Sequence, residues 1–281
     1  MTVSYVFSVL KSRLKDVDDG EIEARYILEK VSGLSYSEIL YRGSDGISSE
    51  KYEEAMAMAD RRLAGDPIQY ILGSWDFMDF TFKVGEGVLI PRPETEILVE
   101  YIYEKIKDIN EPVIYDLCSG SGCIGLSLKK LYNNAKVYLV EKSHKALSYL
   151  KDNCLELCGD LENATVIQGD ILKAEDFDCL PCADVIVSNP PYIRSDEIST
   201  LQSEVLREPH MALDGGEDGL IFYRCLVSDW SKKLKNNGFM AFECGEDQAE
   251  DICELFEKIE FDSEIVNDYN NIQRIVIGRR N

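Results

Sequence analysis

From Pro112 onward, short apolar segments that favour strands alternate with longer segments that favour helices. The expected strands are Val113–Leu117, Lys136–Glu141, Ala164–Gln168, Ala183–Ser188, Gly238–Glu243 and Arg274–Gly278. The clearest expected helices are His144–Cys158, Leu220–Lys235 and Gln248–Lys258. Strands that alternate with helices along a chain form a mainly parallel sheet that helices cover on both faces. The pattern therefore predicts a doubly wound α/β domain.

The residues before this domain follow two other patterns. In residues 1–73, apolar positions such as Ile27 and Val31 recur at helical spacing, which predicts a small helical bundle. Aromatic and β-branched residues between Trp75 and Val84 predict a β-hairpin. The expected organisation is a helical domain at residues 1–73, a β-hairpin linker at residues 74–93 and the α/β domain at residues 94–281.

A proline-containing segment, Val88–Glu96, joins the hairpin to the α/β domain. Its two prolines, Pro91 and Pro93, favour an extended backbone in the residues that precede them. Thr95 or a neighbouring residue is then expected to cap a helix that continues to about Ile106.

A glycine-rich turn follows the strand at 113–117 directly. It reads Cys118-Ser119-Gly120-Ser121-Gly122 and leads into a helix. Glycines allow a ligand to approach the backbone closely, and the N–H groups at the start of a helix face such a ligand. Glu141 ends the next strand, where its carboxylate can accept hydrogen bonds from both hydroxyls of a ribose. Asp170, after the third strand, is expected near an adenine amino group, although Gly-Asp is equally typical of a turn.

The turn alone does not identify the nucleotide. The spacing of Gly120, Gly122 and Gly125 also fits the dinucleotide fingerprint, so NAD and S-adenosyl-L-methionine both remain open at this point. Asp116, just before the turn, favours S-adenosyl-L-methionine. A carboxylate there would repel a pyrophosphate, whereas it favours the cationic sulfonium and amino groups of the methyl donor, directly or through water.

The tetrapeptide Asn189-Pro190-Pro191-Tyr192 follows the buried strand at 183–188. In a doubly wound sheet, ligands bind beyond the carboxyl ends of the strands, near the point where the strand order reverses. The strand at 183–188 is expected beside the strand at 113–117. Asn189 should therefore lie opposite the glycine-rich turn, within reach of the donor methyl group.

The residue types of the tetrapeptide suit methyl transfer to a planar nitrogen. An amide nitrogen is a poor nucleophile because its lone pair is delocalised, so the site must hold the NH2 group with two acceptors. The Asn189 side-chain oxygen and the Pro190 carbonyl can do so, on a backbone that Pro190 and Pro191 make rigid. Tyr192 can lie against the flat face of the amide. Positioning of this kind can supply several kcal/mol of the barrier without a strong base.

These residues resemble the peptide chain release factor N5-glutamine methyltransferase family, of the PrmC/HemK type. Besides the tetrapeptide, the resemblance rests on Arg62–Gly73, Val88–Glu96 and Glu208–Leu220, and it extends over nearly the whole chain. Two departures are small: Cys118 stands where many relatives have Gly, and Glu141 where many have Asp. Cys118 adds only a small side chain, and Glu141 keeps the carboxylate.

The resemblance implies a fold, a reaction and a partner. The fold is a five-helix N-terminal domain and a seven-stranded, Rossmann-like class I methyltransferase domain. S-adenosyl-L-methionine would bind to Cys118–Gly122, Glu141 and Asn189, and S-adenosyl-L-homocysteine would be the product. Asn189–Tyr192 would hold the substrate, which is the glutamine of the Gly-Gly-Gln tripeptide in class-I release factors.

Composition bears on the competing functions. The chain has 30 Lys and Arg against 52 Asp and Glu, a formal charge of −22. This charge disfavours an adenine-N6 methyltransferase that acts on nucleic acid, although such an enzyme would suit the same tetrapeptide. A ribosomal-protein glutamine methyltransferase has the same chemistry, so Asn189–Tyr192 cannot separate it. The function of a nicotinamide dehydrogenase would not explain the tetrapeptide. The function of a non-catalytic binding module would not explain why the site is complete.

The remaining expectations concern metals, location and assembly. Two histidines and cysteines without a second pair at zinc-site spacing predict no metal site. No apolar run approaches the roughly 20 residues that span a membrane, and no signal peptide is expected. We therefore expect a cytoplasmic monomer whose partner is a protein, without direct contact with nucleic acid or membrane.

Overall fold

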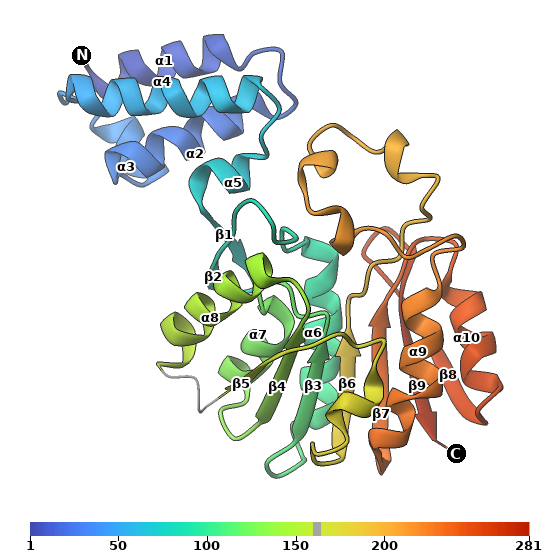
Figure 1. Ribbon diagram of the computed structural model, residues 1–281. Coiled ribbons are helices and arrows are strands. Elements are labelled where there is room, and N and C mark those ends of the chain that lie inside the picture. Colours follow the sequence, from blue (N-terminus) through green and yellow to red (C-terminus); the bar gives the residue numbers. More distant parts are fainter. Residues whose placement is uncertain (160–163, 281) are drawn as a thin grey trace. The chain divides into compact units, whose positions relative to one another are not determined.

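The computed structural model describes residues 1–159 and 164–280 (Figure 1). The chain divides into two compact units, each of which contains two stretches of sequence. Unit 1 comprises Met1–Ser74 and Gln202–Arg207, and unit 2 comprises Trp75–Leu201 and Glu208–Asn281. The short segment Gln202–Arg207 therefore belongs with the N-terminal helices, although it lies far from them in sequence.

Unit 1 is a helical bundle with its own apolar core. Its helices are α1 (Val3–Arg13), α2 (Gly20–Ser32), α3 (Tyr36–Tyr41), α4 (Ser49–Leu63) and α5 (Ile68–Leu72). Each longer helix packs one face into this core; α2, for example, buries Ala24, Ile27, Leu28 and Val31. The helical N-terminal region that the apolar spacing predicts is thus confirmed.

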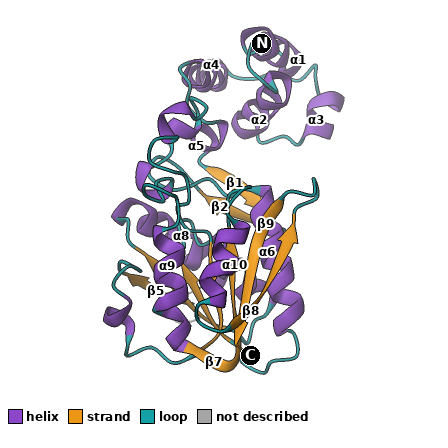
Figure 2. Ribbon diagram, turned by 90° about the vertical axis from the view of Figure 1, so that its right-hand side faces the viewer, coloured by secondary structure: helices purple, strands orange, loops and turns teal. Residues whose placement is uncertain are grey.

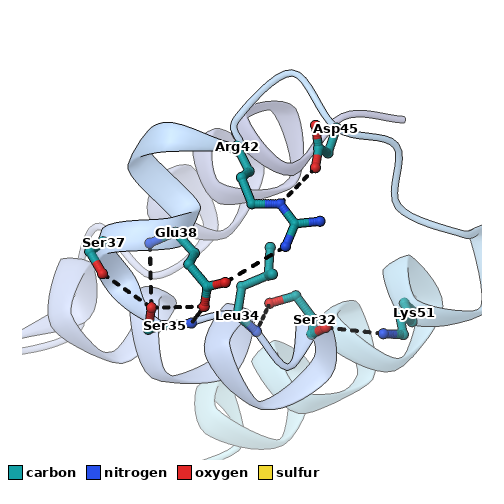
Figure 3. A network of polar contacts seen from close by, with 8 residues as sticks. All are labelled: Ser32, Leu34, Ser35, Ser37, Glu38, Arg42, Asp45 and Lys51. Atoms are coloured by element: carbon teal, nitrogen blue, oxygen red, sulfur yellow. Dashed lines mark hydrogen bonds and ion pairs between the residues drawn. The ribbon is translucent and has the colours of Figure 1, made fainter.

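Local polar contacts define the turns around α3 (Figure 3). The Ser35 hydroxyl accepts a hydrogen bond from the Glu38 N–H, and the Ser35 N–H donates to the Glu38 carboxylate at 2.9 Å. This reciprocal pair satisfies two N–H groups at the start of the helix. Both Ser35 contacts hold the pKa of Glu38 below its ordinary value. Arg42 then pairs with Glu38 and Asp45, while Lys51 donates to the Ser32 carbonyl.

Charged contacts attach the segment Gln202–Arg207 to the rest of unit 1. Arg62 is only 5% exposed, and its guanidinium lies 2.5 Å from both the Glu23 and the Glu204 carboxylates. Arg207 donates to the Ala64 carbonyl at 2.9 Å. A buried guanidinium needs such partners, because an unpaired charge in the interior is costly.

In the described part of unit 2, seven strands form one sheet in the order β5-β4-β3-β6-β7-β9-β8. The strands are β3 (Val113–Leu117), β4 (Lys136–Glu141), β5 (Ala164–Gln168), β6 (Ala183–Ser188), β7 (Leu234–Glu243), β8 (Phe261–Asn267) and β9 (Gln273–Arg280). Strands β3 to β7 pair in parallel, and β9 runs antiparallel between β7 and β8. The predicted mainly parallel α/β fold is confirmed.

Helices cover both faces of this sheet (Figure 2). One face carries α6 (Pro93–Ile106), α7 (Cys123–Leu131) and α8 (His144–Cys158), and the other carries α9 (Ile221–Ser228) and α10 (Ala249–Glu257). Successive residues of a strand point to opposite faces. Ile114 accordingly packs in the first core, whereas Val113 and Tyr115 pack in the second.

A two-stranded hairpin, β1 (Ser74–Phe77) and β2 (Phe80–Lys83), precedes the sheet. Phe77 and Phe82 pack edge to face, with ring centres 6.1 Å apart, in the core beneath α6. Asn153 of α8 bonds both the N–H and the carbonyl of Lys83. These contacts hold the hairpin against α8.

Two expected elements differ from the structure, and one strand was not expected. Strand β8 has no counterpart among the strands expected from the pattern, because its residues 262–264 are polar and exposed. The helix expected at Leu220–Lys235 ends at Ser228, and β7 already begins at Leu234. Helix α6 begins at Pro93, a favoured residue in the first turn, and Arg92 precedes it without a side-chain cap. Thr95 therefore caps nothing and lies within the first turn.

Candidate active site

A cavity opens beyond the carboxyl ends of β3, β4 and β6. The residues predicted from the sequence that line it are Cys118, Ser119, Gly120, Ser121, Glu141, Asp170, Asn189 and Pro191. The predicted residues that do not line it are Asp116, Gly122, Pro190 and Tyr192. The structure thus brings most of the predicted site together in one cavity, and the other four residues do not contribute to its lining.

Sheet topology explains this convergence. Strands β3 and β6 are neighbours, and Leu117 at the end of β3 is opposite Ser188 at the end of β6. The chain then continues from these two residues into the glycine-rich turn and into the tetrapeptide. The strand order reverses between β3 and β6, which is where doubly wound sheets bind their ligands.

Glu141 organises the glycine-rich turn. Its carboxylate accepts hydrogen bonds from the Gly120 N–H at 2.8 Å and from the Ser143 N–H at 2.6 Å. Burial raises the pKa of Glu141, and these backbone contacts oppose that rise. Each carboxylate oxygen keeps a further lone pair, so the side chain can still accept hydrogen bonds from a ligand in the cavity.

The backbone of the turn explains why glycine is favoured there. Gly122 has φ +84°, and a Cβ on it would lie 2.4 Å from Leu150 of α8. Its role is close packing of the turn against that helix. Cys118 has φ +61°, in the left-handed region where a non-glycine residue costs about 1–2 kcal/mol. The Cys in place of Gly therefore strains the backbone, which was not expected from side-chain size.

Asp116 lies at the base of the turn and is 1% exposed. One carboxylate oxygen accepts a hydrogen bond from the Gly125 N–H at 2.9 Å, and the other is buried without a partner. Burial raises the pKa of Asp116 to about 7, against the opposing effect of the Gly125 contact. The side chain thus orients the first turn of α7 and keeps one acceptor available to a cationic group or a water.

The raised pKa of Asp116 makes stability depend on pH. A carboxyl whose pKa is higher in the folded than in the unfolded chain adds stability that is complete below about pH 4 and is lost as the pH rises through 7. From pH 6 to pH 8, the free energy of unfolding should fall by about 1.4 kcal/mol from this group. Urea denaturation at both values should show a smaller fall for Asp116→Asn. An equal fall in both proteins would mean that Asp116 ionises as in the unfolded chain.

Asn189 is held by two residues that the sequence did not assign to the site. Its side-chain N–H donates to the Thr95 hydroxyl at 3.3 Å, and the Thr95 hydroxyl donates to the Glu243 carboxylate at 2.5 Å. Thr95 and Glu243 are each 2% exposed. Thr95 was expected to cap a helix and Glu243 to end a strand, and no sequence pattern linked either of them to Asn189.

Contacts with Gln248 and Gly219 fix the last residue of the tetrapeptide, Tyr192. The Tyr192 carbonyl accepts a hydrogen bond from the buried Gln248 side chain at 2.9 Å. A Cβ on Gly219 would lie 2.4 Å from the same carbonyl, so only glycine fits there. Burial raises the pKa of Tyr192, and its hydroxyl therefore stays protonated.

The two other segments of the sequence resemblance within unit 2 meet at Glu208. The buried Glu208 carboxylate accepts a hydrogen bond from the Ile90 N–H at 2.9 Å and pairs with Arg92. Burial raises the pKa of Glu208, and Arg92 opposes that rise. This contact ties Val88–Glu96 to Glu208–Leu220, and both segments contribute residues to the cavity.

Among the described residues, no group of three or more His, Cys, Asp or Glu side chains is placed to hold a metal ion. No helix in the described ranges is long and apolar enough to cross a membrane.

Two family models match this chain along most of its length. Residues 7–73 match the PrmC N-terminal domain, and residues 93–226 match the methyltransferase small domain. A release factor glutamine methyltransferase of Thermodesulfovibrio yellowstonii is 39% identical over 242 residues, which are 85% of each chain. One from Clostridium acetobutylicum is 37% identical over 282 residues, which cover 98% of this chain and 95% of that protein.

A solved structure supports the fold alone. The precorrin-6y C5,15-methyltransferase of Geobacter metallireducens superimposes with a TM-score of 0.50 at 14% identity, over 71% of this chain and 94% of the other. The resemblance seen in the sequence is confirmed by the two closer relatives, which align along most of their length. The chain belongs to the release factor glutamine methyltransferase family.

Proposed function

We propose that this protein transfers a methyl group from S-adenosyl-L-methionine to the side-chain nitrogen of a glutamine. The glutamine is that of the Gly-Gly-Gln tripeptide in class-I peptide chain release factors. The orientation of Asn189 is the observation that carries the proposal. Because its NH2 group donates toward Thr95, its carbonyl oxygen is free to accept a hydrogen bond from a substrate amide. The family membership supports the choice of substrate.

The residues of the cavity fit the methyl donor. The buried Glu141 carboxylate lines the cavity beside the glycine-rich turn Cys118–Ser121, where ribose hydroxyls can donate to it. Asp116 has a buried oxygen without a partner, which suits a cationic ligand or its bound water. Asp170 pairs with Lys142 at 2.8 Å and lies at the far wall, where the adenine would bind. When bound, S-adenosyl-L-methionine supplies an electrophilic methyl group on a cationic sulfur.

The protein's own residues then position the nucleophile. The Asn189 side-chain oxygen and the Pro190 carbonyl accept the two N–H bonds of the glutamine amide. Its lone pair is thereby aimed at the methyl group, and Tyr192 packs against the amide plane. Proton loss follows attack, when the nitrogen is cationic, so no strong base is needed beforehand. Alignment of this kind supplies part of the barrier reduction that enzymes obtain from orientation.

The division of labour between the parts of the chain is also a proposal. Residues 1–73 would dock the protein substrate, residues 74–93 would link, and residues 94–281 would bind the donor and carry out the reaction. We further propose that the protein acts as a monomer in the cytoplasm, without direct contact with nucleic acid or membrane.

One experiment separates this function from its nearest rivals. The protein is incubated with S-adenosyl-L-methionine labelled in the methyl group and with release factor, ribosomal protein or nucleic acid in turn. We expect label in the release factor, on the glutamine of Gly-Gly-Gln. Label only in ribosomal protein would leave the chemistry and change the substrate, and label in adenine would replace the proposal.

Glu141→Gln tests the donor site. The substitution keeps the size of the side chain and one acceptor oxygen but removes its charge. A hydrogen bond to a charged group is stronger than a neutral one by roughly 1–1.5 kcal/mol, so the affinity for S-adenosyl-L-homocysteine should fall about tenfold. Calorimetric titration measures this. An unchanged affinity would show that Glu141 only supports the turn through Gly120 and Ser143.

A further inference from the structure

The side chain of Asn189 poses a problem of orientation. Its oxygen end and its NH2 end have nearly the same shape, but only the oxygen can accept a hydrogen bond from a substrate amide. Turned by 180°, the side chain would present N–H groups to the N–H groups of the substrate and repel them. Some group in contact with Asn189 must therefore select one orientation, and Thr95, a nearly buried residue of the cavity lining, lies within hydrogen-bonding distance.

The hydrogen bonds of Thr95 and Glu243 allow only one orientation of the Asn189 side chain. An ionised carboxylate can only accept hydrogen bonds, so Glu243 takes the single hydroxyl proton of Thr95. The Thr95 oxygen is then left as an acceptor, and only the NH2 end of Asn189 can donate to it. The side-chain N–H of Asn189 is also within hydrogen-bonding reach of Glu243. Both contacts place the NH2 end inward and the oxygen end outward.

We propose that Glu243, acting through Thr95, is a positioning residue that fixes the Asn189 amide with its oxygen toward the substrate. This inference rests on the proposed function, because it assigns the acceptor role to that oxygen. Neither residue touches the reacting nitrogen; both act through Asn189. The distance in sequence from Thr95 to Glu243 explains why the pattern of residues did not reveal them together.

The surroundings of Glu243 make the arrangement sensitive to pH. Arg274 from β9 and Glu94 from α6 face it, together with Tyr192, Cys244 and Cys123 of α7. Burial raises the pKa of the last three, so they stay neutral. Burial also raises the pKa of Glu243 to about 7, while its hydrogen bond with Thr95 and the charge of Arg274 oppose the rise.

Protonation of Glu243 would remove this preference for one orientation of the Asn189 amide. A protonated carboxyl can donate to the Thr95 oxygen, and the Thr95 hydroxyl is then free to donate to the oxygen of Asn189. The amide can turn, and its NH2 end then faces the substrate. At saturating donor, the rate should consequently fall about tenfold for each pH unit below 7.

Three variants test the assignment by single-turnover methylation of the release factor at saturating donor. Thr95→Val, which has nearly the same shape, should lower the rate about 10- to 100-fold, since small losses of alignment cost this much. Thr95→Ser keeps the hydroxyl and should stay within about threefold of the wild type. Glu243→Gln can present either end to Thr95, so it should be about tenfold slower at pH 8 and lose the fall below pH 7.

Thr81→Val is the matched control. The Thr81 hydroxyl donates to the Asp76 carboxylate at 2.6 Å at an exposed position of the hairpin, so the variant breaks a similar pair outside the cavity lining. It should react at the wild-type rate. Calorimetric titration with S-adenosyl-L-homocysteine should show that Thr95→Val and Glu243→Gln change donor affinity only a few-fold. The expected loss is then in the turnover rate and not in donor binding.

A second readout does not depend on the substrate. In nuclear magnetic resonance spectra of the ligand-free protein, the Asn189 side-chain NH2 signal, assigned by its loss in Asn189→Ala, should titrate near pH 7. The titration should disappear in Glu243→Gln, which removes the titrating group, and should be smaller or shifted in pH in Thr95→Val, which leaves only the direct contact between Asn189 and Glu243. A signal that titrates unchanged in both variants would overturn the positioning role, as would a wild-type rate for Thr95→Val. If the wild type failed to methylate the release factor while the signal behaved as expected, only the proposed substrate would be wrong.

Discussion

Asn189→Ala is expected to lower the rate of methyl transfer about 10²–10³-fold at saturating donor, because one aligned acceptor contributes roughly 2.7–4 kcal/mol in a transition state. As the nitrogen attacks, positive charge develops on its hydrogens, and the Asn189 oxygen stabilises that charge more than it stabilises the resting amide. The loss should therefore affect the chemical step. Donor affinity should change less, since the glycine-rich turn and Glu141 remain in place.

Single-turnover kinetics with excess enzyme and saturating donor measure this step. Asn189→Gln should lose activity to a similar extent, because its oxygen is displaced by one methylene group. Asn236→Ala is the matched control: Asn236 lies in the exposed part of β7 and contacts only Arg280 among the described hydrogen bonds. Near-normal turnover of Asn189→Ala would remove Asn189 from the acceptor role and transfer the positioning task to the Pro190 carbonyl.

The sequence predicted those parts of the fold whose determinants are local. Buried parallel strands such as Val113–Leu117 are apolar throughout, and a glycine-rich turn next to such a strand marks the ligand edge. The edge strand β8 was missed because it is half polar, and its place in the sheet depends on pairing with β9. Whether residues 261–267 form a strand therefore depends on pairing with β9 and not on their own sequence pattern.

The residues of the candidate site also differ in whether local sequence predicts their position. Asn189, Glu141 and the glycine-rich turn follow strand ends directly, so sequence order was enough to place them. Glu243 lies near Asn189 because β7 pairs with β6, with Phe242 opposite Ser188. Thr95 reaches both residues only when α6 packs against the sheet, and nothing in its local sequence predicts that contact. Asp116 was expected to favour the cationic donor directly or through water; it does not line the cavity, and it bonds to Gly125 with one oxygen while the other has no partner.

Deletion of residues 1–73 is expected to lower kcat/KM for the whole release factor about 10²–10³-fold while donor affinity is maintained. A specific protein pair buries roughly 800 Å² on each partner, and a few residues of such a surface contribute about 2 kcal/mol or more each. The cavity offers much less area than this. The helices of unit 1 have their own core and supply none of the residues that line the cavity, so we expect the deletion to affect docking and not chemistry.

A short Gly-Gly-Gln peptide separates docking from chemistry. It is too small to reach a remote surface, so the full-length and the truncated protein should methylate it equally slowly. The deletion also removes Arg62 and Ala64, the partners of Glu204 and Arg207. The full-length double variant Glu204→Gln, Arg207→Gln breaks these contacts without removing the helices, and it should keep most of its activity on the release factor.

The dependence on salt concentration also separates docking from chemistry. The chain carries a formal charge of −22, and this charge should accelerate its encounter with a basic partner. The rate with the whole release factor should decline as ionic strength rises, whereas the rate with the peptide should change little. If the folded, truncated protein methylated the whole release factor at the full-length rate, residues 1–73 would have no docking role. If the double variant lost as much activity as the deletion, the anchoring of Gln202–Arg207 would account for the loss. The outcome that supports docking is a large loss on the whole factor, no loss on the peptide and little loss in the double variant.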